Sequence, residues 1–108
     1  MESCVVCFVT VDTRENAEII AFSLVQEKIA ACVNIISQIR SIYTWKNKIF
    51  DENEFLLIIK TKYSLFETLK NRVRQAHPYE TPEIICIKIL DGLPEYLNWI
   101  NDSTQNMS

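Results

Sequence analysis

The feature that most constrains this fold is a run of nearly twenty residues, 31–49, that contains neither proline nor glycine and shows no helical stripe of apolar side chains. Many alternate positions are apolar or aromatic, which is typical of a β-strand. At about 3.3 Å per residue such a run spans roughly 60 Å, whereas a domain of this size has a radius of gyration of roughly 13 Å. The run must therefore bend, break or extend beyond its own domain.

Two turn-like stretches, at residues 46–48 and 50–53, separate this run from an apolar strand at residues 54–61. The pattern predicts two long antiparallel strands. The chain has a single glycine, so turns that need a positive φ angle must rely on Asn or Asp. If the hairpin extends outwards, its exposed edges need partners, and another subunit is the natural one.

Capping sequences indicate two helices. Asp12 and Ser64 are each followed three residues later by Glu, a capping-box spacing. The first helix is expected to end near residue 29, and the second at His77, which precedes a proline. A short third helix is expected at residues 95–101, after a proline that can begin it.

The order of elements predicts the fold class. β-branched runs at residues 4–11 and 84–90 predict two further strands. The order is then β-α-β-β-α-β followed by a short helix, which predicts an α+β, ferredoxin-like sandwich with two helices on one face of a four-stranded sheet. The chain of 108 residues fits a single domain, residues 1–102, and residues 103–108 are expected to form a frayed tail.

Composition narrows the classes of function. The net charge of −3 argues against a nucleic-acid binder, because such domains concentrate positive charge to meet phosphates. The N-terminus lacks the basic start of a secretory signal, and no apolar run is long enough to cross a membrane. We therefore expect a soluble, cytoplasmic protein with reduced cysteines. Cys4 and Cys7 have C-x-x-C spacing, but positions three apart in a strand face opposite sides, so we interpret both as buried small side chains.

The densest chemistry lies in residues 77–83, HPYETPE, which contain the only histidine, two of the three prolines and two carboxylates. The prolines restrict the backbone, which suits a binding or docking surface, and is equally compatible with a plain link between helix and strand. No nucleophile and base set and no glycine-rich phosphate loop is present, so no enzymatic activity is predicted. His77 has no second ligand at metal-site spacing, so a tight metal site would need several subunits.

Five motifs connect these observations to a known family. They are residues 30–34 (AACVN), 41–45 (SIYTW), 60–61 (KT), 77–84 (HPYETPEI) and 96–99 (YLNW). Their order and spacing resemble those of the CutA family, the divalent-cation tolerance proteins, and the resemblance covers practically the whole chain.

The resemblance implies a ferredoxin-like fold close to that of the PII signalling proteins, a tight homotrimer assembled through the long hairpin, and a cytoplasmic setting. It also implies a link to copper and other divalent ions, and no established reaction. Asn47 stands where the family usually has glycine, and where copper ligands have been proposed in the family this chain has Val9, Ala76 and His77, so only His77 remains. The positions that the resemblance places in clefts between subunits are Tyr43, Trp45, Lys60, Thr61, His77, Tyr79, Glu80 and Glu83.

Three hypotheses follow. In the first, a trimeric cytoplasmic protein binds Cu²⁺ or another divalent ion weakly, with His77 and Glu80 as metal ligands. In the second, a PII-like regulatory module holds a small anionic ligand between subunits, where Lys60 neutralises the anion and Tyr43 and Trp45 stack on it. In the third, the same residues mainly build the trimer, with Tyr43 and Trp45 as interface anchors.

Overall fold

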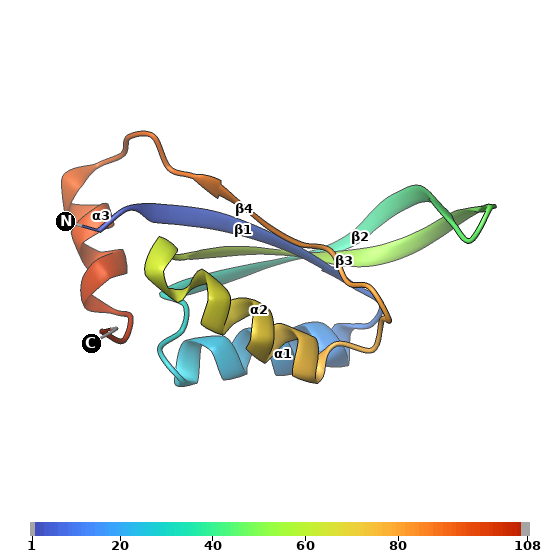
Figure 1. The fold of residues 1–108 in the computed structure, drawn as a ribbon, viewed down its shortest axis with the longest axis horizontal. Coiled ribbons are helices and arrows are strands. Elements are labelled where there is room, and N and C mark those ends of the chain that lie inside the picture. Colours follow the sequence, from blue (N-terminus) through green and yellow to red (C-terminus); the bar gives the residue numbers. More distant parts are fainter. Residues whose placement is uncertain (1, 107–108) are drawn as a thin grey trace.

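The computed structural model describes residues 2–106, which form one four-stranded antiparallel sheet with three α-helices (Figure 1). The strands lie in the order β2-β3-β1-β4. Helices α1 and α2 cover the same face of the sheet, while α3 lies at the end far from the hairpin tip. This is the α+β, ferredoxin-like arrangement that the sequence predicts. The elements are β1 (Cys4–Val11), α1 (Arg14–Gln26), β2 (Cys32–Trp45), β3 (Lys48–Lys62), α2 (Phe66–Ala76), β4 (Ile84–Lys88) and α3 (Pro94–Asp102).

The hairpin of β2 and β3 is longer than the sheet that carries it. Of the residues of β3, only 55–62 pair with β1. The outer part of the hairpin therefore has no third strand beside it. We call this two-stranded part, residues 39–54, the ribbon. It extends away from the body along the longest dimension of the molecule, 44 Å (Figure 1). The long extended run therefore reaches beyond the body of its own domain.

A β-bulge lies where the ribbon leaves the body. Between Ile36 and Ile39, β2 has two residues where β3 has one, Phe55, and Gln38 has a φ angle of 60°. An extra residue bends a strand and increases its twist. It also reverses the side-chain alternation, because successive residues of a strand face opposite sides.

The alternation predicted along residues 31–49 therefore does not continue past the bulge. Before it, Ile35 pairs with Leu57, whose side chain is fully buried. Beyond it, Tyr43 pairs with Phe50, which by the two-residue period lies on the opposite face of β3 from Leu57. The bulge thus decides which side chains of β2 face the same way.

One of the two predicted turns is wrong. Lys46 and Asn47 form the turn with φ angles of 50° and 64°. Asn47 takes the positive φ expected of it, but the expectation that such positions rely on Asn or Asp is wrong for Lys46, Lys28 and Gln38. Residues 50–53, predicted as a second turn, belong to β3 and pair with residues 40–43. There the Asp51 carboxylate accepts two hydrogen bonds from Arg40, at 2.8 and 2.6 Å. Cross-strand pairing overrides the turn-like composition of this stretch.

Both helix starts differ slightly from the capping prediction. α1 is capped by the Thr13 hydroxyl, which accepts a backbone N–H at 3.1 Å, and not by Asp12. It ends before the predicted residue 29, because Lys28 turns the chain at a φ angle of 58°. Ser64 does not cap α2: it lies in a 3-10 turn before the helix, and its hydroxyl has no hydrogen-bond partner in the described part of the chain. The predicted end of α2 at His77 is confirmed.

The apolar core lies between the sheet and the two long helices. Burial raises the pKa of the Cys7 thiol to about 12, with a smaller contribution from Cys86, which pairs with it across the sheet. Cys7 is therefore an unreactive core side chain, and all four cysteines are free thiols. The fully buried core side chains include Val5, Cys7, Val9, Val11, Ala17, Ile20, Leu24, Leu57, Ile59, Leu69 and Val73.

The C-terminal segment differs from the predicted frayed tail. The buried Thr104 hydroxyl donates to the Ile100 carbonyl at 3.0 Å, and the Gln105 N–H donates to the Lys28 carbonyl at 2.8 Å. Residues 103–105 are thus attached to the body, and Met107 and Ser108 lie outside the described residues.

β4 is two residues shorter than predicted. Across residues 2–106, no helix combines the length and apolar character needed to cross a membrane.

Candidate functional site

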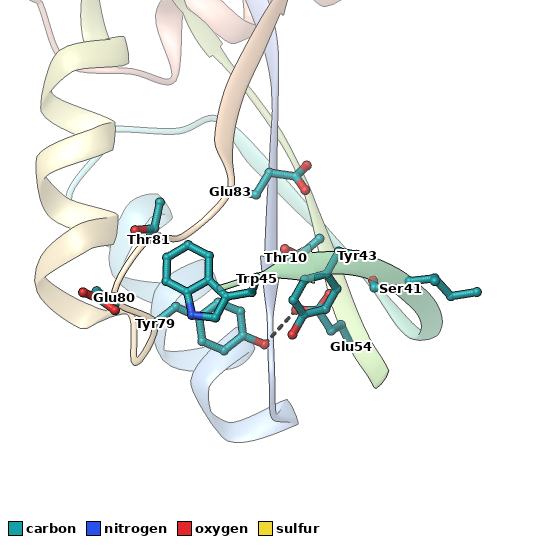
Figure 2. A pocket seen from close by; sticks show the side chains of 10 residues that line it. Thr10, Ser41, Tyr43, Trp45, Glu54, Tyr79, Glu80, Thr81 and Glu83 are labelled. Carbon is teal, nitrogen blue, oxygen red and sulfur yellow. Dashed lines mark hydrogen bonds between the residues drawn. The ribbon is translucent and has the colours of Figure 1, made fainter. Parts of the chain in front are cut away.

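A cavity of about 570 Å³ lies between the ribbon and the loop that joins α2 to β4 (Figure 2). We call it the ribbon pocket. Its walls come from four segments: the end of β1, the outer half of β2, the middle of β3, and the loop. The lining residues are Thr10, Ser41, Ile42, Tyr43, Trp45, Glu54, Tyr79, Glu80, Thr81 and Glu83.

Glu54 and Tyr79 form the most buried polar contact of the ribbon pocket. Only 6% of Glu54 is exposed, and its Oε2 accepts a hydrogen bond from the Tyr79 hydroxyl at 2.7 Å, drawn as a dashed line in Figure 2. Burial, and then the Glu54 carboxylate, raise the pKa of Tyr79, so the phenol stays protonated and remains a donor. Because a buried carboxylate is costly without a donor, this bond holds the pocket wall in place.

His77 contacts Tyr79 and is not part of the pocket wall. Its Nε2 is 2.7 Å from the Thr10 carbonyl oxygen, and its Nδ1 accepts the Tyr79 backbone N–H at 3.1 Å. A carbonyl oxygen only accepts and a backbone N–H only donates, so Nε2 carries the proton and the ring is neutral. The ring also packs against that of Tyr79, with centroids 4.6 Å apart. Both ring nitrogens thus position the loop.

Tyr43 is fixed from the ribbon side. Its ring stacks on Phe50 across the hairpin, with centroids 5.4 Å apart. Its hydroxyl donates to the Glu52 carboxylate, and this bond raises the pKa of Tyr43 to about 12. The phenol is therefore held as a neutral wall of the pocket.

Trp45 and Glu80 lie at the edge of the pocket and share a neighbour, Lys46. The Lys46 ammonium lies 5.6 Å from the centroid of the Trp45 ring and 3.5 Å from Glu80 Oε2. Lys46 belongs to the ribbon turn and Glu80 to the loop after α2, so this contact joins two segments that are distant in the sequence.

The wall of the ribbon pocket is negatively charged. Glu54, Glu80 and Glu83 line it, and none of the ten lining residues is lysine or arginine. Burial, and then the charge of Glu54, raise the pKa of Glu83. The field inside the pocket therefore favours cations over anions.

The structure brings together part of the predicted site. Thr61 is fully buried, and its hydroxyl donates to the Ile29 carbonyl at 2.6 Å. Lys60 contacts Asn34 across the hairpin, and six residues of strand, about 20 Å, separate it from Glu54. Within one chain, Lys60 and Thr61 are thus outside the pocket, like His77. The predicted residues that do line it are Tyr43, Trp45, Tyr79, Glu80 and Glu83.

Sequence reasoning missed five lining residues: Thr10, Ser41, Ile42, Glu54 and Thr81. Ser41 and Ile42 belong to the motif at residues 41–45, and Thr81 to the motif at 77–84, but only other residues of these motifs were predicted to line a cleft. Glu54 carried a signal of its own, since it is a charged residue directly before the apolar run at residues 55–59. Nothing in the sequence marks Thr10, which lines the pocket because β1 ends beside the base of the ribbon.

Comparison with known proteins gives a consistent result over nearly the whole chain. Residues 5–103 match the family model described as CutA1 divalent ion tolerance protein. The chain belongs to the CutA1 family. The crystal structure of CutA1 from Oryza sativa is similar at a TM-score of 0.95 and 40% identity, over 98% of this chain and 97% of that one. The CutA1 structure from Thermus thermophilus has a TM-score of 0.90 and 43% identity, over 97% and 100% of the two chains.

Curated CutA relatives differ in length and in named compartment. "Protein CutA, chloroplastic" of Arabidopsis thaliana is 47% identical over 102 residues, 94% of this chain and 56% of that protein. "Divalent-cation tolerance protein CutA" of Thermus thermophilus is 43% identical over 99 residues, 92% of this chain and 96% of that protein. This chain thus spans about half of the first relative and nearly all of the second. A solved CutA from Archaeoglobus fulgidus is described as periplasmic.

Proposed function

We propose that this chain acts in the tolerance of divalent cations, as a trimer that binds a divalent metal ion weakly in the ribbon pocket. The observation that carries the proposal is the set of three carboxylates, Glu54, Glu80 and Glu83, in a wall without a basic residue. Membership of a family described by divalent-ion tolerance supports the cellular role. That family is an ion-tolerance family and not a known enzyme family.

The donor atoms of the pocket suit hard divalent ions. Carboxylate oxygens are the ligands that Mn²⁺, Mg²⁺ and Ca²⁺ prefer, whereas Cu²⁺ binds imidazole nitrogen well. His77 is the only imidazole of the chain, and a copper bond there would displace one of its two hydrogen bonds. Within residues 2–106, no three His, Cys, Asp or Glu side chains are grouped so as to hold one ion. We therefore propose weak binding with Glu80 as a ligand, and His77 as a ligand only if its ring is released.

The trimer is supported by surfaces that have no neighbour within one chain. β2 and β4 are the edges of the sheet, and a two-stranded hairpin alone is marginally stable in water. Ile42 and Ile49 of the ribbon are 65% and 79% exposed, and Phe22 of α1 is 66% exposed. Further subunits would bury this apolar surface. In such an assembly we propose that Lys60 faces the cleft from a neighbouring subunit, while the buried Thr61 supports β3 through its bond to the Ile29 carbonyl.

The two other hypotheses differ in support. A PII-like module for a small anion is not favoured by the pocket of one chain, because three carboxylates line it and Lys60 lies about 20 Å away along the strand. A purely structural role for Tyr43 and Trp45 is compatible with their exposure, 38% each, which an interface would reduce.

We also propose a cytoplasmic location, because free thiols are typical of proteins in a reducing compartment.

Calorimetric titration with Mn²⁺ and with Cu²⁺ in a non-chelating buffer tests the metal proposal. We expect weak binding that decreases several-fold in a Glu80→Gln, Glu83→Gln double variant, because each substitution removes a charged oxygen donor. Glu18→Gln, on the exposed face of α1, is the matched control. The proposal is wrong if neither ion binds, or if the double variant binds as the control does. Unchanged binding in His77→Ala would remove His77 from the ligand set.

The mass of the protein in solution, measured by light scattering, tests the trimer. We expect the mass of three chains for the unmodified protein and a smaller mass for Ile42→Lys, because a charge would be placed on the exposed ribbon surface. Ile42→Val is the control and should remain trimeric. A monomeric unmodified protein would contradict the assembly. If Trp45→Ala dissociates the trimer while metal binding is absent in every variant, the structural role is favoured.

A further inference from the structure

The ribbon pocket has walls that a metal ion does not need. Tyr43, Trp45 and Tyr79 line it together with the three carboxylates, and Figure 2 shows Glu54 beside the rings, with Glu80 and Glu83 on either side. Aromatic faces attract cations and also cover hydrocarbon. A volume of about 570 Å³ lies in the range of small-molecule sites. These walls suit a cation that is larger than a metal ion and has an apolar part.

The chain itself places an ammonium group at the edge of this pocket. Lys46 Nζ lies over the Trp45 ring, 5.6 Å from its centroid, and 3.5 Å from Glu80 Oε2. The side chains of Lys46 and Glu80 are each 70% exposed. Exposed ion pairs are weak, so another ammonium ion can compete with Lys46 for the same ring and carboxylate.

A second anionic group lies deeper in the pocket. Glu54 is 94% buried, and while its Oε2 is bonded to Tyr79, its Oε1 makes no hydrogen bond within residues 2–106. This oxygen is not among the buried atoms that lack a partner, so it is accessible on the pocket wall. A protonated amine supplies both a donor and the opposite charge. Glu83, on the same wall, adds to the negative field.

We propose that the ribbon pocket binds an organic cation that carries a protonated primary amine on a short alkyl chain. The ammonium group binds to the carboxylates of Glu54 and Glu83, and the alkyl chain packs on the rings of Trp45 and Tyr43. Lys46, at the edge of the pocket, competes with the alkyl chain for the Trp45 ring and repels a second positive charge. This inference goes beyond the proposed metal function, because the ligand uses the aromatic walls and needs no metal ion.

Calorimetric titration with butylammonium, in neutral buffer that contains a chelator, tests the inference. Two probes with the same alkyl chain are the controls: 1-butanol, which is neutral, and butyrate, which is an anion. We expect butylammonium to bind and the two controls not to bind, because only the cation matches the three carboxylates. The inference is overturned if butylammonium does not bind, or if either control binds as tightly.

Paired variants locate the bound cation. Lys46→Met removes the competitor, and we expect butylammonium to bind about two- to fivefold more tightly, while Lys48→Met at the same hairpin tip leaves affinity unchanged. Glu83→Gln is expected to weaken binding about three- to tenfold, while Glu18→Gln has no effect. If Lys46→Met and Lys48→Met bind butylammonium with equal affinity, or if Glu83→Gln and Glu18→Gln do, the proposed position of the cation is wrong. Because the chelator removes metal, failure of the Mn²⁺ and Cu²⁺ titrations does not affect this result.

Discussion

The body of the sheet and the ribbon are made from the same strands and are stabilised in different ways. In the body, Leu57 and Ile59 of β3 are fully buried under the helices. In the ribbon, Ile49 of the same strand is 79% exposed, and stacking of Tyr43 on Phe50 takes the place of burial. The body therefore has its own apolar core, whereas the ribbon depends on cross-strand contacts and on whatever covers it.

The ribbon pocket lies at the junction of these two regions. Glu54, the last ribbon residue of β3, is buried there, whereas Trp45 at the end of β2 is still 38% exposed. The cavity therefore contains both a buried carboxylate and an accessible aromatic ring. Substitutions in the body, in the ribbon and at their junction are therefore expected to differ in effect.

The largest difference is expected between two apolar truncations in β3. Leu57→Ala should lower the free energy of unfolding by about 2–5 kcal/mol, because it leaves a cavity in the core. Ile49→Ala should lower it by a smaller amount, because within one chain this side chain is in solvent and only a neighbouring subunit can bury it. Urea denaturation followed by circular dichroism, at one protein concentration, measures both values. Equal losses would mean that the ribbon is buried as deeply as the body.

The next effect concerns the junction. Tyr79→Phe removes the donor to the buried Glu54 carboxylate and should cost about 1–3 kcal/mol of unfolding free energy. Tyr63→Phe is the matched control, because Tyr63 is 62% exposed, and it should change stability by less than about 0.5 kcal/mol. Thermal unfolding monitored by circular dichroism compares the two variants. If Tyr79→Phe were as stable as its control, the contact with Glu54 would not hold the pocket wall.

The smallest effect is a pH dependence at Glu83. Its pKa is raised in the folded state by burial and by the charge of Glu54, so the folded protein favours the protonated acid. Its contribution to stability is therefore complete below the unfolded value of about 4.5 and is lost as pH rises through the folded pKa. Glu83→Gln should raise the melting temperature slightly at neutral pH, and the gain should vanish below about pH 4. A variant that is less stable at neutral pH, or a gain that persists in acid, would contradict this account.

Local patterns in the sequence predicted most of the fold. Apolar alternation and β-branched runs identified the strands, the proline after His77 marked the end of α2, and the CutA resemblance is confirmed by the family match. The prediction that residues 50–53 form a turn was wrong, since turn propensity is weak compared with a continuous ladder of cross-strand hydrogen bonds. The cap of α1 was misplaced by one residue for a similar reason, because Asp12 and Thr13 are both good caps and the packing of the helix selects one.

The sequence by itself determined the order of elements, the long extended run of β2 and the residue types near the candidate site, because these depend on local periodicity and backbone restraint. Only the tertiary structure decided which of those residues meet. The bulge between Ile36 and Ile39 reverses the alternation of β2, and the register of β3 brings Glu54 to Tyr79, while Lys60 is about 20 Å away along the strand. It also revealed that both nitrogens of His77 are hydrogen-bonded. Such contacts join residues far apart in the chain, and no pattern along the sequence specifies them.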